Sequence, residues 1–325
     1  MAARFKTVDD LLSDVRSMID EDNVENVKND TDLLPALNRA QDYAANILSR
    51  HYESPMLTKI NVTMTAGEQE YDIPEDAFEQ RIEKLEMFIT RLYYPLARID
   101  YRDISLYETP TNVNVPYYYA VVGKKFRLVP GPTGTYPLRL WYLKDPDPLV
   151  KSQGRVTRVN TTDNYVVVDT VGGDLTAVSD DLKSFVNIID GQTGTIKGTF
   201  QIKSINGGRV TFKTSIDGGR TSVHGRTIST SMATSGDNLI EIDDYVCLAE
   251  GTCVPFFQKP FNNFMVQYAV AEIRRKLGGP ADMELRVLQE LEKQVERSWV
   301  GREQSMRVKK KSRNWWLPSR RWFND

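Results

Sequence analysis

Apolar residues near the N-terminus recur at helical spacing. Thr7 and Asp10 can cap a first helix, whose apolar face runs from Val8 to Ile19. After the acidic, Asn-rich segment 20–30, Asp32 and Pro35 mark the first turn of a second helix. The apolar face of this second helix consists of Leu33, Leu37, Ala40, Ala44, Ile47 and Leu48. The spacing predicts helices over 7–19 and 32–50 that pack together.

From Leu57 the apolar period changes to two, as in strands. Ile60, Val62 and Met64 alternate with polar residues, and Ala66-Gly67-Glu68 predicts a hairpin turn into a short strand over 70–73. Tyr, Val, Leu and Phe predict further strands over 82–93, 117–122, 126–129 and 138–143. These segments predict a small antiparallel sheet.

Short β-rich runs follow between Lys151 and Gly236. They cover residues 155–159, 165–169, 185–189, 195–205, 209–213 and 226–229. Their links carry Asp190-Gly191, Asn206-Gly207 and Asp217-Gly218, pairs that accept positive φ in tight turns. Helical spacing returns over 261–277 and in a last helix that ends near Trp299. We therefore interpret the β-rich stretch as an insertion, with Gly154 and Gly236 near its hinges.

These patterns predict an α+β fold: a helical bundle with a small antiparallel sheet, an inserted small all-β barrel or sandwich domain, and an extended C-terminal tail. We expect the first part of the helical and β core at 1–150, the inserted domain at 151–236, the C-terminal helices at 237–300 and the tail at 301–325. A chain of 325 residues exceeds the size at which a single core stops growing, which agrees with more than one domain.

Charge is segregated along this chain. The tail carries eight Lys or Arg against two acids, so its charge is +6, and because the whole chain sums to −2 the first 300 residues sum to −8. Four large aromatics close the tail without a helical or strand period, so a partner surface is expected to receive them. The predicted docking residues are Arg307, Lys309, Lys310, Lys311, Arg313, Trp315, Trp316, Arg320, Arg321, Trp322 and Phe323. The alternative is a tail folded back on its own domain.

The basic segment 307–313 could also bind single-stranded nucleic acid or an anionic membrane surface. The aromatics, however, cluster beyond the charges instead of interleaving with them, which favours a protein partner. No signal pattern opens the chain, and its longest apolar run, Tyr117–Val122, is far shorter than the roughly 20 residues that span a bilayer.

No catalytic or metal-binding pattern emerges from the residues. His51 and His224 lack nucleophile-like neighbours, and Cys247 and Cys253 lack the spacing of a zinc or redox site. The glycine-rich run 191–198 lacks the Lys-Ser/Thr ending of a phosphate loop and predicts a hairpin turn instead. The acidic pairs lack calcium-loop spacing and are interpreted as turn and cap residues: Asp145 and Asp147, Asp180 and Asp181, Asp243 and Asp244. We expect no enzyme, no cofactor and no metal.

Four segments resemble the head-to-tail connector (adaptor) proteins of tailed bacteriophages. They are Leu33–Gln41, Glu70–Pro74, the run from Gly123 to Pro132 that leads into Leu138–Tyr142, and the helix from Phe264 to Gly278. The resemblance implies a ring, usually of twelve copies, seated under the portal at the phage neck, with helices around a channel for DNA and the tail laid on the portal. The inserted β domain departs from the short connectors.

The resemblance also implies the partners and the location. The partners would be the portal protein, a tail or nozzle protein and further copies of the chain, with DNA passing through without sequence-specific binding and with no membrane. The protein would be assembled in the host cytoplasm and reside in the virion neck. The alternatives are another tail or neck ring component, such as a nozzle or fibre-attachment protein, and a host-cell enzyme or nucleic-acid binder.

Overall fold

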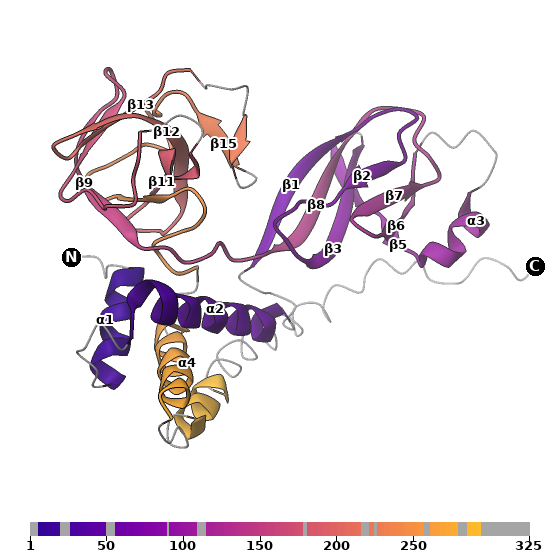
Figure 1. The fold of residues 1–325 in the computed structure, drawn as a ribbon. Coiled ribbons are helices and arrows are strands. Elements are labelled where there is room, and N and C mark those ends of the chain that lie inside the picture. Colours follow the sequence, from indigo (N-terminus) through magenta and orange to yellow (C-terminus); the bar gives the residue numbers. More distant parts are fainter. Residues whose placement is uncertain are drawn as a thin grey trace, which may run out of the picture. The chain divides into compact units, whose positions relative to one another are not determined.

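The structure is a computed structural model that describes residues 6–19, 27–49, 56–89, 91–108, 115–177, 181–215, 221–223, 226–256, 261–278 and 285–293. The chain divides into two compact units (Figure 1). One comprises Met1–Ile47 and Pro146–Asp325, and the other comprises Leu48–Asp145. The fold is mixed α+β with several sheets, as the sequence predicts.

The first unit begins with the predicted helices. In α1 (Val8–Ile19), the Thr7 N–H donates to Asp10 Oδ2 at 2.9 Å and the Asp10 N–H donates to Thr7 Oγ1 at 3.3 Å. This reciprocal cap is the one that the sequence predicts. A π-helical turn, η1 (Asn29–Leu33), leads into α2 (Leu34–Ser49), and all six residues of its predicted apolar face are buried. Helix α4 (Phe261–Lys276) confirms the predicted third helix.

Helix α4 contacts both N-terminal helices. The Arg274 guanidinium donates to the Met18 carbonyl at 2.9 Å, and the rings of Tyr43 and Phe264 stack with centroids 5.9 Å apart. A bundle of these helices is expected to bury Leu37, Ile47, Tyr268 and Ile273, and of these Leu37, Ile47 and Ile273 are buried. Tyr268 is only half-buried, because it packs against Tyr43, which is itself 39% exposed. A closed helical bundle stays a prediction. Residues 285–293 are helical, and Trp299 lies outside the described residues.

The β strands of the first unit form an eight-stranded sheet of order β11-β16-β9-β10-β13-β12-β15-β14, in which β11 also pairs with β12. The strands are β9 (Ser152–Asn160), β10 (Tyr165–Val168), β11 (Phe185–Ile189), β12 (Ile196–Asn206), β13 (Arg209–Phe212), β14 (Ser222–Val223), β15 (Arg226–Ser229) and β16 (Tyr245–Leu248), with a 3-10 turn η3 (Leu182–Ser184) before β11. The predicted strands are confirmed, whereas the barrel or sandwich form stays a prediction.

The eight-stranded sheet extends past the predicted end of the inserted domain. Strand β16 begins nine residues after Gly236 and lies between β11 and β9, where all four of its residues are buried. Gly154, expected near a hinge, lies inside β9, and a Cβ there would stand 2.3 Å from the Thr170 carbonyl oxygen. The domain boundaries at 150, 236 and 300 stay predictions.

The second unit contains two four-stranded sheets instead of the single small antiparallel sheet that the sequence predicts. One has the order β1-β8-β3-β4 and the other β2-β7-β6-β5, in which β5 and β6 are parallel. The strands are β1 (Leu57–Met64), β2 (Glu70–Asp72), β3 (Ala77–Ile89), β4 (Leu92–Pro95), β5 (Ala97–Arg98), β6 (Tyr118–Val122), β7 (Lys125–Val129) and β8 (Tyr136–Lys144). A 3-10 turn η2 (Tyr101–Asp103) and α3 (Ile104–Tyr107) follow β5.

Two local predictions in this unit are wrong. Strands β1 and β2 do not form a hairpin: β1 pairs with β8, and β2 pairs with β7 in the other sheet. The turn at Gly67 carries the chain from one sheet to the next, and Tyr71 then stacks on Phe126 with centroids 5.5 Å apart. The single strand predicted over 82–93 is two strands, β3 and β4, because the chain reverses at Arg91, which has positive φ.

Candidate functional site

The predicted docking tail lies outside the described residues. This holds for all eleven of its predicted contact residues, from Arg307 to Phe323. The two histidines, His51 and His224, are outside the described residues as well. The surfaces that the structure does describe are therefore considered on their own.

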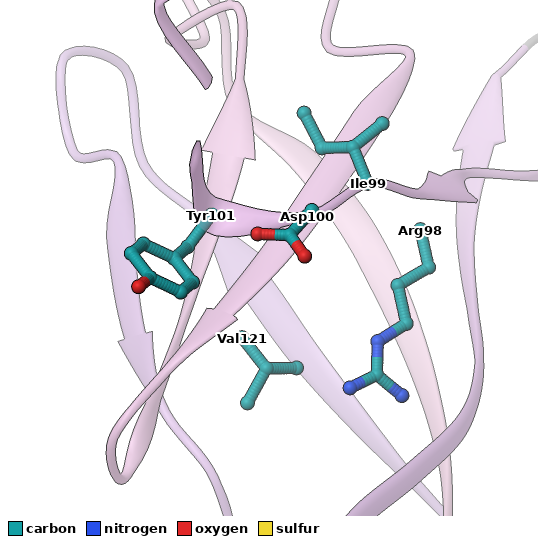
Figure 2. Close-up of a pocket in the computed structure, with 5 residues that line it drawn as sticks. All are labelled: Arg98, Ile99, Asp100, Tyr101 and Val121. Carbon is teal, nitrogen blue, oxygen red and sulfur yellow. The ribbon is translucent and has the colours of Figure 1, made fainter. Parts of the chain in front are cut away.

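A pocket of about 340 Å³ opens in the second unit, where η2 follows β5. It is lined by Arg98, Ile99, Asp100, Tyr101 and Val121 (Figure 2). The parallel pairing of β5 with β6 positions the residues that line this pocket. It continues past the end of β5, where the Ile99 N–H donates to the Tyr119 carbonyl at 2.9 Å. In Figure 2 the Asp100 carboxylate lies between the side chains of Arg98 and Tyr101.

The Asp100 carboxylate already has a structural role at this pocket. It caps η2 by accepting the Arg102 N–H at 3.0 Å. The remaining lining residues provide a guanidinium, a phenol and two aliphatic side chains, which do not form a nucleophile–base pair. These side chains offer polar and apolar groups for contact with another molecule.

Exposed aromatic and aliphatic side chains also occur on the segments next to the pocket-lining residues in sequence, in α3 and just before β6. Leu106 is 75% exposed, Tyr117 59% and Tyr101 57%. Tyr107 lies against Tyr118, with ring centroids 4.6 Å apart. Apolar side chains that gather on a surface mark contacts with other molecules. The sequence shows the run Tyr117-Tyr118-Tyr119 but predicts only a strand there, since its periodicity does not tell which of the three rings is left in solvent.

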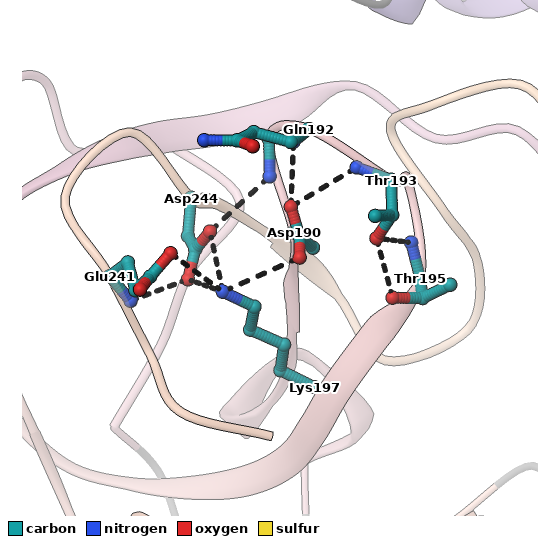
Figure 3. Close-up of polar contacts among 8 residues, drawn as sticks. Asp190, Gln192, Thr193, Thr195, Lys197, Glu241 and Asp244 are labelled. Atoms are coloured by element: carbon teal, nitrogen blue, oxygen red, sulfur yellow. Dashed lines mark hydrogen bonds and ion pairs between the residues drawn. The ribbon is translucent and has the colours of Figure 1, made fainter. Parts of the chain in front are cut away.

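A second polar arrangement surrounds Lys197 at the start of β12 (Figure 3). The Lys197 ammonium lies 3.0 Å from Asp244 Oδ2, 3.6 Å from Asp190 Oδ2 and 3.8 Å from Glu241 Oε2. Its side chain and that of Asp244 are each 3% exposed. Asp244 also accepts the backbone N–H groups of Gly191 and Glu241. The cluster joins the β11–β12 turn to the turn that precedes β16.

The electrostatics of this cluster fit a structural role. Burial raises the pKa of Asp244, although the Glu241 N–H and Lys197 oppose that effect. Burial also acts to raise the pKa of Asp190, but the N–H groups of Gln192 and Thr193 outweigh it, and the net shift is downward. The backbone donors and Lys197 occupy the carboxylate oxygens of Asp244. The glycine-rich run 191–198 is thus the predicted hairpin turn between β11 and β12.

Of the acidic pairs, Asp181 and the pair Asp243 and Asp244 have the predicted turn and cap roles, whereas Asp145 and Asp147 lie outside turns and helix caps. Asp181 caps η3 by accepting the Lys183 N–H at 3.0 Å. Asp147 forms an ion pair with Arg226, and Asp243 forms one with Arg155. Asp180 lies outside the described residues.

A metal site and a membrane span were sought across the described ranges. These residues contain no group of three or more His, Cys, Asp or Glu side chains that could hold a metal ion. Among the described helices, none is long and apolar enough to cross a membrane.

Comparison with known protein families shows which family the chain belongs to. A sequence model of the SU10 adaptor protein family matches residues 6–170, just over half of the chain. The chain belongs to the SU10 adaptor protein family. It is therefore a structural adaptor protein of a bacteriophage and a component of the virion. This family of structural proteins is not a known enzyme family. No curated protein matches the chain.

The family match covers three of the four segments that carry the resemblance to phage connectors. Leu33–Gln41 lies in the last residue of η1 and in α2, Glu70–Pro74 includes β2, and the run from Gly123 to Tyr142 includes β7 and most of β8. The fourth segment, from Phe264 to Gly278, lies in and just after α4, beyond the matched residues. The match also enters the eight-stranded sheet as far as β10.

Proposed function

We propose that this adaptor protein forms a ring that joins the portal to the tail around the DNA channel of the phage neck. Membership of the SU10 adaptor protein family is the observation that carries the proposal, because an adaptor contacts other components of its virion. In this proposal about twelve copies surround the channel, and the helices α1, α2 and α4 lie nearest to it.

The charge distribution supports passage of DNA through such a ring. The first 300 residues sum to −8, and fixed negative charge lowers the affinity of a surface for phosphate. A channel wall of this kind lets duplex DNA slide. The net charge is positive only in residues 301–325, where it can serve in attachment instead.

The C-terminal tail is the proposed portal anchor. Its charge is +6, and it carries Trp315, Trp316, Trp322 and Phe323. Trp and Arg are the residue types that most often dominate the binding energy of protein interfaces. The inserted β strands would then lie outside the ring, where they could contact a neighbouring tail or fibre protein.

A pull-down on portal rings tests the anchor. Deletion of residues 307–325 is expected to leave a folded protein that no longer binds the portal, because the buried apolar residues that the structure describes all precede residue 307. Replacing Trp315 and Trp316 by Ala is expected to cost about 2 kcal/mol of binding free energy or more. A matched control replaces Ser305 and Ser312 by Ala and is expected to bind normally. Undiminished binding by the deletion variant would contradict the proposal.

A further inference from the structure

Strand β1 is a long edge strand. It spans eight residues, Leu57–Met64, and lies at the end of the order β1-β8-β3-β4. Within the described residues no strand pairs with its other side. Edge strands in natural proteins are usually short or carry proline or several charges, because their unpaired backbone groups recruit other strands. Strand β1 has no proline and a single charge, Lys59.

The pairing of β1 with β8 shows which backbone groups point away from the sheet. The Lys144 N–H donates to the Met56 carbonyl at 2.7 Å, so these two residues form a hydrogen-bonded pair. Because such pairs alternate along an antiparallel ladder, every second residue of β1 turns its N–H and C=O outward. The outward residues are Leu57, Lys59, Asn61 and Thr63. Pro137, opposite Thr63, has no N–H to donate, which agrees with this assignment.

The other edges of the second unit are less suited to pairing. Strand β4 ends at Pro95, and β2 and β5 are three and two residues long. Beyond Thr63 the edge of β1 is closed as well, because the Thr65 N–H donates to Tyr71 Oη at 2.9 Å. The open edge is therefore confined to residues 57–63.

The side chains of β1 leave an apolar surface that an added strand would cover. Met64 is buried in the core of the second unit, and Val62 packs against it. Ile60 lies on the same face but is 41% exposed, since no neighbouring strand covers it. A strand with the same alternation, placed alongside, would bury Ile60.

We propose that two copies of this chain pair through β1, antiparallel and with the two-fold axis at Ile60. In this register Leu57 faces the partner's Thr63, and Lys59 faces the partner's Asn61. All four outward residues then exchange their hydrogen bonds, and Ile60 meets the partner's Ile60 in the core of a continuous sheet. A shift by two residues in one direction opposes the two Lys59 side chains, and in the other it leaves Leu57 without a partner, so this register is the favoured one.

Two-fold pairing is distinct from ring closure, because a cyclic ring joins two different surfaces of neighbouring subunits. The inference thus goes beyond the proposed neck ring and concerns the free protein. It identifies a second copy as the chain that protects the open edge of β1.

Disulfide trapping tests the register in the full-length chain. In a non-hydrogen-bonded pair the Cα atoms are about 4.5 Å apart, within the range of about 4.4–6.8 Å that a disulfide spans. We expect Ile60→Cys to give a covalent dimer as its main species after treatment with diamide. Asn61→Cys is the matched control, because residues on the diagonal of a pair are about 7–8 Å apart and its thiol would face the partner's Lys59. The native Cys247 and Cys253 are buried, so wild-type protein is expected to stay monomeric on a denaturing gel.

A charge exchange provides the second measurement. Asn61→Lys places two lysines opposite each other at both ends of the pair and is expected to weaken dimerisation several-fold in sedimentation equilibrium. Adding Lys59→Glu restores opposite charges and is expected to restore the dimer. Equal cross-linking of Ile60→Cys and Asn61→Cys, no cross-link in either folded variant, or a double variant no stronger than Asn61→Lys would overturn the inference.

Discussion

At the scale of single residues, Lys197 links parts of the chain that are distant in sequence. Its ammonium pairs with Asp244, 47 residues away, and both side chains are almost completely buried. Removing one partner of a buried ion pair lowers the stability of the fold much more than replacing both partners, because the remaining charge is left buried without compensation. The pair therefore stabilises the junction of the β11–β12 turn with the turn before β16.

Replacing Lys197 tests this coupling. We expect Lys197→Met to lower the free energy of unfolding by about 3 kcal/mol, since the Asp244 carboxylate loses its cation. The double variant Lys197→Met with Asp244→Asn removes the lone charge and keeps an acceptor for the backbone donors. It is expected to be more stable than Lys197→Met alone in urea denaturation. Additive destabilisation by the two changes would show that the residues are not coupled.

Asp32 predicts a pH dependence at the start of the second helix. The hydrogen bond from Lys276, supported by the Lys28 N–H, lowers the pKa of Asp32 from 3.8 to about 2. A carboxyl group whose pKa is lower in the folded state contributes stability above its unfolded pKa and loses it as the pH falls through the folded pKa. The contribution should therefore disappear between about pH 4 and pH 2.

Urea denaturation at several pH values measures this effect. Wild type is expected to be more stable than Asp32→Asn at pH 6, and the difference is expected to shrink as the pH falls from 4 towards 2. Asp30→Asn provides a nearby carboxylate control, and its effect should be the smaller one at pH 6. A difference between wild type and Asp32→Asn that is the same at pH 6 and pH 2.5 would contradict the role of the Lys276 contact.

The residue-scale features that the sequence predicts are the local ones. The cap formed by Thr7 and Asp10 spans three residues, so spacing alone indicates it. The partners of Lys197 come from two turns that are distant from each other in sequence, and no spacing rule connects them. The exposure of Tyr101 and Tyr117 likewise depends on the tertiary packing around them, and not on the local sequence pattern.

At the scale of elements, periodicity predicts where strands lie better than it predicts which strands pair. Strand β1 was correctly placed, yet its partner β8 begins more than seventy residues after it. A turn such as the one at Gly67 has the same sequence signature whether it closes a hairpin or carries the chain between two sheets. The sequence did not predict strand β16. Its four residues are all buried, so apolar and polar residues do not alternate along it.

The inserted β domain is expected to fold by itself, and the structure shows that its sheet also includes β16. A fragment covering 146–254 contains β16, whereas the predicted domain 151–236 leaves β9 and β11 without the strand between them. We expect the longer fragment to melt cooperatively with a β-type circular dichroism spectrum. The shorter fragment is expected to melt at a lower temperature or without cooperativity. Equal stability of the two fragments would show that β16 is dispensable.

At the scale of the whole molecule, the sequence resemblance and the family match agree on a phage adaptor. The resemblance rests on specific sequence segments. One of them, Leu33–Gln41, lies within the residues that the family model matches. The division into these two compact units was not predicted, because one of its boundaries, near residue 47, falls inside the continuous helix α2. The charge segregation was read from composition alone and supports the proposed separation of channel and anchor.

The most direct test of the proposed neck ring is a cryo-electron microscopy map of the virion neck. The account predicts a closed ring of this chain between portal and tail, with residues 301–325 on the portal, the strands of 151–236 outside, and a channel wall without Lys and Arg side chains. A map that places the chain away from the axial channel, or that shows a channel wall rich in Lys and Arg, would contradict it.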